Sequence, residues 1–290
     1  RTSTQAGYRL RDASDSFQPA LWYGCPWDDI GRGIKGVKYE ERFTNFPTLT
    51  GYGSAGTAET ELAYAYYFDS GCTIAQANAT FGGLAMTQDG SDNDEIWIQA
   101  GGNAGASFVF NDPVNGATGY TDRMDVWYDC RFKVSSVVDD VVAVFMGLAE
   151  KGLAIADTKV DNTGVMVDKD WIGFQTVHTN SGTTGTNAVL KFSYRKEGLT
   201  VQHPIASLAT LVADTEIAVG FHYRNVNDSN HRITVFKNNA KQGTGVTEAA
   251  VQATTFPDGI PMSPMWGCKA GTGTTSIFTP IYIRAAMVKW

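Results

Sequence analysis

The sequence predicts an all-β protein built as a two-sheet antiparallel sandwich. In residues 125–134 apolar side chains alternate with charged ones, as in a strand with one buried face and one solvated face. Residues 141–148 are apolar on both faces, which is typical of a strand covered on both sides. The 31 glycines and frequent turn residues indicate many short strands. We expect 125–134 and 141–148 to pair as an antiparallel hairpin.

Residues 1–60 follow no sustained hydrophobic period, and we expect them to form an irregular N-terminal arm ahead of a sandwich spanning residues 61–290. The arm contains three large rings close together, those of Trp22, Tyr23 and Trp27. Rings of this size in an irregular segment must be buried somewhere. They are therefore predicted to contact either the chain's own sandwich or a neighbouring subunit, and both alternatives stay open.

Strand patterns recur from residue 61 onward, with about ten to thirteen strands in all. Asn238 and Asn239 predict a hairpin turn, because asparagine tolerates positive φ. The last strand runs to the end of the chain, and closure of a sheet is expected to depend on it. Besides the two strands already described, alternating or apolar runs predict strands in 61–68, 81–87, 95–99, 107–110, 170–177, 188–195, 216–224, 232–238 and 280–290.

Composition excludes several classes of protein. With 43% hydrophobic residues the chain can bury a substantial core. A formal charge of -7 argues against a nucleic-acid partner, because nucleic-acid surfaces need a basic stripe. No run approaches the roughly 18 apolar residues of a membrane-spanning helix, so no membrane partner is expected. Because the chain begins with Arg1 rather than Met, we expect that an upstream piece was removed or is not included.

The four cysteines have no C-x-x-C spacing, which argues against a structural zinc site and against a disulfide scaffold. Cys130 lies in the apolar register of its strand and is interpreted as a small buried hydrophobe. Free thiols are therefore expected at Cys25, Cys72, Cys130 and Cys268.

We predict no catalytic residue, no cofactor and no enzymatic activity. The four histidines have no metal-ligand spacing, and no nucleotide-binding loop or nucleophile elbow is present. A retaining glycosidase needs two carboxylates about 5 Å apart. Asp168 and Asp170 are the one pair at alternate positions next to a strong strand, and we interpret them as part of a solvated turn.

The acidic segment 89–95 has two interpretations. Asp89, Asp92 and Asp94 could supply oxygen ligands to a calcium ion, since hard cations need several oxygens from one turn. The segment lacks the glycine and distal glutamate of an EF-hand loop, however. A polar hairpin turn capped by Asp and Asn is the favoured interpretation, so no metal is predicted.

Three tryptophans lie in strand registers that otherwise carry polar or small residues: Trp97, Trp127 and Trp171. Rings on a sheet face can stack on sugars, which makes these residues candidates for glycan binding. The alternative is that a second layer, a loop or a neighbouring subunit covers them. A glycan is thus a possible partner.

Several runs of the sequence carry a family resemblance: DNDEIWIQAGG, GASFVFND, DVWYDCRFKVSS, VFMGLAEKGLA, DKDWIGFQT, LKFSYRKEG and the closing PIYIRAAMV. Together they resemble proteins of tailed bacteriophages that contain a concanavalin-A-like, LamG-type jelly roll. The N-terminal LWYGCPWDDI and GVKYEERF also look like the lead-in segment of such proteins. The resemblance covers most of the chain, but its motifs are structural.

The resemblance implies a virion structural protein, either a capsid decoration (cement) protein or a head-fibre component. Its partners would be the major capsid protein and copies of itself, with a trimer as the analogous assembly. It would be made in the host cytoplasm and reside on the capsid surface, with Trp22, Tyr23 and Trp27 docking on a neighbour. The alternative function is a carbohydrate-binding, lectin-like module of a phage fibre, and a glycoside hydrolase is the third hypothesis.

Overall fold

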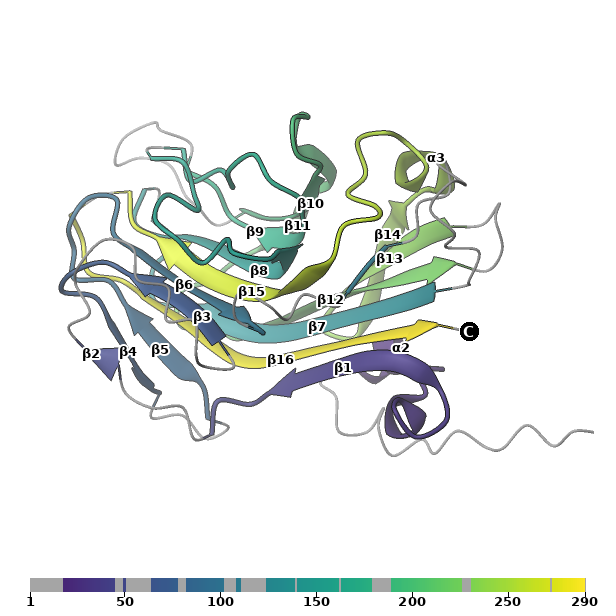
Figure 1. The fold of residues 1–290 in the computed structure, drawn as a ribbon. Coiled ribbons are helices and arrows are strands. Elements are labelled where there is room, and N and C mark those ends of the chain that lie inside the picture. The colour runs from purple at the N-terminus through teal and green to yellow at the C-terminus, as the bar shows by residue number, and fades with distance from the viewer. Residues whose placement is uncertain are drawn as a thin grey trace, which may run out of the picture.

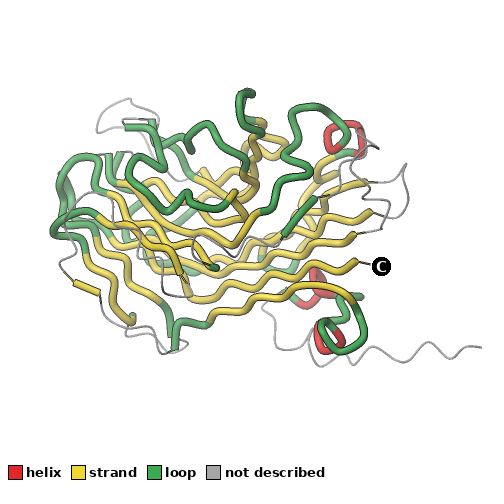
Figure 2. The backbone as a smooth tube through the Cα atoms, in the orientation of Figure 1, coloured by secondary structure: helices red, strands yellow, loops and turns green. Residues whose placement is uncertain are grey.

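A computed structural model describes residues 18–44, 49–50, 64–77, 82–101, 108–110, 124–138, 140–161, 163–178, 189–225, 231–271 and 273–289. These residues form two antiparallel sheets packed face to face, which confirms the predicted jelly-roll sandwich class (Figure 1). Figure 2 shows that strands and loops make up nearly all of the described backbone. The described helices are short: α2 (Pro19–Trp22), the 3-10 helix η1 (Trp27–Asp29) and α3 (Glu248–Val251).

The larger sheet has nine strands among the described residues. They are β1 (Lys35–Glu41), β2 (Leu49–Thr50), β4 (Thr73–Gln76), β5 (Leu84–Thr87), β7 (Met124–Val134), β12 (Ile217–Asn225), β13 (His231–Lys237), β14 (Ala240–Val246) and β16 (Ile277–Lys289). Their order is β14-β13-β12-β7-β16-β5-β4-β2, and β1 also pairs with β16. The C-terminal strand β16 therefore lies in the middle of this sheet, where it joins β7 to β5 and β1.

The smaller sheet has seven described strands. They are β3 (Tyr64–Phe68), β6 (Glu95–Ala100), β8 (Ala143–Glu150), β9 (Trp171–Gln175), β10 (Val189–Arg195), β11 (Gln202–Thr210) and β15 (Met262–Lys269). Their order is β11-β10-β9-β8-β15-β6-β3. In Figure 1 this sheet lies above β12, β7 and β16 of the larger sheet.

The predicted hairpin between residues 125–134 and 141–148 is wrong. β7 pairs with β12 and β16 in the larger sheet, whereas β8 pairs with β15 and β9 in the smaller one. The segment between them crosses from one sheet to the other. Both strands bury their apolar faces in the core between the sheets, which satisfies the same hydrophobic pattern without pairing the two strands edge to edge.

The main core lies between the two sheets and has the register that the sequence predicts for β7. Tyr128, Cys130 and Phe132 of β7 are fully buried there, and the Tyr128 ring stacks on Phe221 at a centroid distance of 5.5 Å. The expected turn at Asn238 and Asn239 is present, with positive φ at both residues. All four cysteines are buried and free. None of the helices in the described part of the chain is long and apolar enough to span a membrane.

Part of the segment expected to be an irregular arm belongs to the larger sheet. β1 pairs with β16 from Lys35 to Glu41, and Val37 and Tyr39 pack against the main core. The expected irregularity of residues 1–60 is therefore corrected for this stretch. Charged residues dominate β1 and hide its short apolar alternation. The division of the chain into an arm and a sandwich remains a prediction.

Candidate functional site

The outer face of the smaller sheet is covered by the chain itself. Residues 151–170, called the covering loop here, connect β8 to β9 and place Leu153, Ala154 and Met166 on this face. There they pack against Trp97 and Trp171, both of which are 0% exposed. The prediction that these two rings stack on a glycan is therefore corrected: the loop occupies the position that a sugar would need.

Glycines let the rings approach this sheet face closely. A Cβ at Gly267 of β15 would come within 2.2 Å of the Trp97 ring, and one at Gly147 of β8 would come within 2.9 Å of the Phe145 ring. The Phe145 and Trp171 rings then meet edge to face with centroids 5.6 Å apart. The rings thus form an aromatic layer on this face, and the covering loop packs against that layer.

Gln99 of β6 holds the start of the covering loop. Its Nε2 donates to the carbonyls of Ala149, at 3.3 Å, and Glu150, at 2.7 Å. Its Oε1 accepts from the backbone N–H groups of Gly152 and Leu153, both at 3.0 Å. One end of this buried amide is therefore bonded to the end of β8 and the other to the start of the covering loop, which explains a fully buried glutamine on this face.

Glu95 of β6 holds the middle of the loop. Its Oε1 accepts from the backbone N–H of Asp157 at 2.6 Å and from Lys269 Nζ at 3.1 Å. Its Oε2 accepts from Trp97 Nε1 at 2.5 Å and from the Lys159 backbone N–H at 3.4 Å. Burial raises the pKa of Glu95, while the Lys269 charge and these hydrogen bonds act in the opposite direction.

Two lysines complete the network: Lys269 of β15 and Lys159 of the covering loop itself. Burial disfavours the charged form of Lys269, but Glu95 and Asp161 together hold its pKa above the ordinary value. Lys159 is fully buried, and burial lowers its pKa to about 7. Its ammonium group donates to the carbonyls of Gly164, at 2.5 Å, and Thr176, at 3.0 Å. None of these anchors was predicted from the sequence. The signal that could have indicated them is the presence of two polar residues, Glu95 and Gln99, in an otherwise apolar strand.

The outer face of the larger sheet is also covered. The N-terminal segment, residues 18–34, packs Leu21, Trp22, Trp27 and other apolar residues onto this face. Trp127 of β7 lies in the same cluster and is 1% exposed, so its predicted availability to a glycan is corrected as well. The Trp127 ring stacks on His222 with centroids 4.6 Å apart.

Arg284 and Asp129 fix the N-terminal segment to the sheet. The Arg284 guanidinium lies 4.5 Å from the Trp22 ring centroid and 3.7 Å from that of Trp27. Asp129 accepts hydrogen bonds from Gln18 Nε2 at 2.6 Å and from Trp22 Nε1 at 3.0 Å. A buried carboxylate with two side-chain donors and a buried guanidinium against two rings indicate a permanent contact.

The three rings proposed as an interface have different environments. Trp22 and Trp27 are buried against the chain's own sheet, which corrects their predicted docking on a neighbour. Of the two alternatives left open for these two rings, the structure supports the chain's own sandwich. Tyr23 differs from both, because it is 77% exposed and does not belong to this cluster. Tyr23 therefore remains a candidate contact residue.

The acidic segment brings two of its three candidate ligands together. The Asp89 and Asp94 carboxyl groups share a hydrogen bond, and the Ser91 N–H donates to Asp89 Oδ1 at 2.7 Å. Burial and the adjacent Asp89 raise the pKa of Asp94 to about 7. Asp92 is exposed, and within the described residues these three form no set of clustered ligand atoms. The geometry is that of a polar turn closed by hydrogen bonds.

Asp168 and Asp170 have opposite environments. Asp168 is half exposed and pairs with Arg195 at 3.0 Å, as expected of a solvated turn. Asp170 is only 4% exposed, and burial raises its pKa to about 6. For Asp170 the interpretation as a solvated residue is corrected, because the end of the covering loop and the hairpin after β10 enclose it.

No protein-family model and no curated protein matches the chain. Solved structures with a similar fold include peanut lectin, at 11% identity, with 88% of this chain and 99% of that chain covered and a TM-score of 0.47. A Bacteroides ovatus mixed-linkage-glucan GH16 protein matches at 10% identity over 85% and 99%, with a TM-score of 0.49. A Shewanella oneidensis protein of unknown function matches at 12% identity over 89% and 88%, with a TM-score of 0.41. Identities and TM-scores this low carry no argument about function.

Proposed function

We propose that this chain is a non-enzymatic structural protein of a tailed-bacteriophage virion, which binds the capsid exterior as a decoration, cement or head-fibre component. The sequence resemblance to virion proteins carries the proposal. From the structural side, one observation bears on the glycan-binding alternative. The covering loop packs over Trp97 and Trp171 on the outer face of the smaller sheet, and buried polar anchors at Glu95 and Gln99 hold it there.

The contact surface of such a protein consists of its loops, its sheet edges and its N-terminal segment, because both outer sheet faces carry the chain's own residues. Tyr23 is the exposed ring of that segment, and tyrosine is enriched in protein interfaces. The partners are the major capsid protein and further copies of the chain. A symmetric trimer on the capsid surface is the analogous assembly.

Particles assembled without this protein and then mixed with the purified chain test the proposal. Wild-type protein should sediment with the particles, and Tyr23→Ala should sediment less while keeping the wild-type melting temperature. Lys35→Ala, an exposed change on β1, is the matched control and should sediment like wild type. Failure of the wild-type chain to bind particles would contradict the proposal.

A lectin-like module is the second candidate, and one observation favours it. The outer face of the smaller sheet has a floor of Trp97, Phe145 and Trp171 beneath the covering loop, which would serve a sugar if the loop moved aside. A glycan array separates the two candidates. Binding by the wild-type chain that is lost in Trp97→Ala and Trp171→Ala would favour the lectin. No binding to the glycan array, together with binding to particles, would favour the structural protein.

A further inference from the structure

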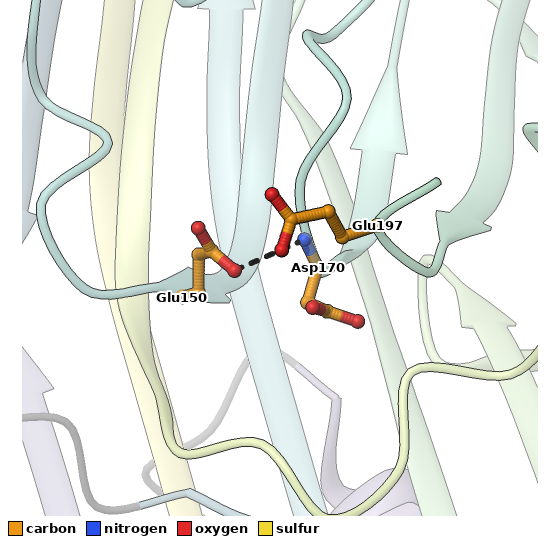
Figure 3. Close-up of side chains that lie close together, drawn as sticks. All are labelled: Glu150, Asp170 and Glu197. Carbon is orange, nitrogen blue, oxygen red and sulfur yellow. Dashed lines mark hydrogen bonds between the residues drawn. The ribbon is translucent and has the colours of Figure 1, made fainter. Parts of the chain in front are cut away.

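Three carboxylates gather at the base of the covering loop. Glu150 ends β8, Asp170 immediately precedes β9, and Glu197 follows β10. Because β8, β9 and β10 are neighbours and antiparallel, these positions meet at one end of the smaller sheet (Figure 3). Each residue offers one carboxylate oxygen, and the three oxygens lie within 4.8 Å of one another.

Asp170 is the member of this set whose hydrogen bonding is incomplete. Asp170 is only 4% exposed, yet among the described residues its Oδ1 has no hydrogen-bond partner. The backbone N–H of Glu197 bonds the carboxyl group, while the Glu150 charge opposes its ionisation. A buried carboxylate oxygen without a donor is costly, and a cation or a proton would relieve that cost.

Lys169 neutralises only part of the charge. Its Nζ lies 2.6 Å from Glu197 Oε1 and 3.3 Å from Glu150 Oε1. No ion pair between Lys169 and Asp170 is present, and the Lys169 side chain is 40% exposed, so it can turn away into solvent. Lys196 also favours the ionised form of Asp170, so the three carboxylates exceed the two lysine charges by one.

We propose that Glu150, Asp170 and Glu197 form a binding site for a divalent cation, with calcium as the ion that fits best. All three ligands are hard carboxylate oxygens, and calcium accepts irregular sets of such oxygens completed by water. Magnesium demands a tighter octahedral arrangement and gives up its water reluctantly. In the ion-bound state, Lys169 leaves Glu150 and Glu197 for solvent.

The site has a structural role for the covering loop. Glu150 and Asp170 stand at its two ends, where the Glu150 N–H donates to the Asp170 carbonyl at 2.9 Å. Glu197 belongs to the hairpin between β10 and β11, whose Gly198 N–H bonds Asp168 Oδ1 at 2.8 Å. A bound ion would therefore tie both ends of the loop to this hairpin. The inference is independent of the proposed function, because it depends on this geometry alone.

Thermal unfolding of the full chain with added calcium chloride tests the site. After treatment with a chelator and desalting, the wild-type melting temperature should rise with calcium, rise less with equal magnesium, and not change at matched sodium chloride. Asp170→Asn should lose the calcium shift, whereas Asp168→Asn, two residues away and outside the cluster, should keep it. Absence of a calcium-specific shift in the wild type would overturn the proposal.

Two further variants keep the test decisive if Asp170→Asn fails to fold. Glu197→Gln changes a half-exposed side chain and should weaken calcium binding about tenfold or more through lost ligand charge. Lys169→Ala removes the competing cation and should strengthen calcium binding. If the cluster were only a network of surface ion pairs, the same change would lower the stability without strengthening calcium binding. Terbium luminescence, sensitised by the adjacent Trp171, reads out occupancy directly. A calcium shift that survives in Glu197→Gln but disappears in Asp94→Asn would assign the ion to the acidic segment and contradict the proposal.

Discussion

The ammonium group of Lys269 on β15 lies 3.1 Å from Glu95 Oε1 on β6, and both side chains are buried. This ion pair lies beneath the covering loop, and each of its members also bonds the backbone of that loop. The two strands are neighbours in the smaller sheet, so the pair connects sheet and loop. It is the centre of the arrangement that closes this face.

Changing Lys269 to Met should destabilise the protein by about 3–5 kcal/mol, because it leaves the Glu95 carboxylate buried without its cation. The double variant Glu95→Gln, Lys269→Met should recover part of that loss. Urea unfolding measures both free energies. Asp168→Asn, which breaks an exposed pair with Arg195, should cost less than about 1 kcal/mol and serves as the control. Equal losses in the buried and exposed variants would count against the network.

Removing the Gln99 side chain should loosen the start of the covering loop. Gln99→Ala leaves the N–H groups of Gly152 and Leu153 without their acceptor, so a loss of about 1–3 kcal/mol is expected. Hydrogen exchange followed by mass spectrometry should show faster exchange in residues 151–158 and little change in β7. Gln242→Ala, which removes an amide bonded to the nearby Ala240 carbonyl, should leave the exchange of the loop unaltered.

Trp22 and Tyr23 are adjacent, but changing them to alanine should affect the stability very differently. Trp22→Ala removes a buried ring that bonds Asp129 and contacts Arg284, so about 3–5 kcal/mol of stability should be lost. Tyr23→Ala changes an exposed ring and should stay within about 0.5 kcal/mol of wild type. Chemical unfolding monitored by fluorescence measures both. A stable Trp22→Ala protein would show that the N-terminal segment is not fixed to the sheet.

The Asp89 and Asp94 pair predicts a pH dependence of stability. The pKa of Asp94 is raised to about 7 in the folded chain, against about 4 when unfolded. The folded state thus binds the proton more tightly, and the stability that this supplies is full below about pH 4 and lost as the pH rises through about 7. The pKa of Asp89 is lowered, so its contribution changes only at lower pH.

Denaturant unfolding between pH 4 and 8 measures this dependence. Asp94→Asn keeps a side chain able to donate to Asp89 but cannot titrate, so the decline in stability between pH 4 and 7 should become shallower. Asp92→Asn changes the exposed neighbour and should reproduce the wild-type profile. An unchanged slope in Asp94→Asn would show that other groups carry the pH dependence.

Local patterns in the sequence predicted much of the fold, because strand periodicity depends on neighbouring residues. The inward register of Tyr128 and Cys130 is an example. β15 escaped prediction, because Ser263 and Pro264 interrupt its apolar run although the strand lies in the middle of its sheet. The partner of β7 was also misassigned, since the pattern of one strand does not identify the sheet to which the next strand belongs.

The features of the site depend on contacts between distant residues, and the sequence does not display them. Trp97 and Trp171 were correctly placed off the core register, but the covering loop has no period that predicts where it packs. Glu150, Asp170 and Glu197 are separated by 20 and 27 positions and meet only because three strands end together. Burial likewise distinguishes Asp170 from Asp168, and only the folded chain sets that burial.

We propose that this chain binds the surface of a virion particle through protein contacts. The decisive measurement is electron cryo-microscopy of assembled particles with and without the protein. We expect extra density on the capsid exterior that fits the two-sheet sandwich, with Tyr23 at the contact and the covering loop closed over Trp97. Identical maps for the two kinds of particle would contradict it.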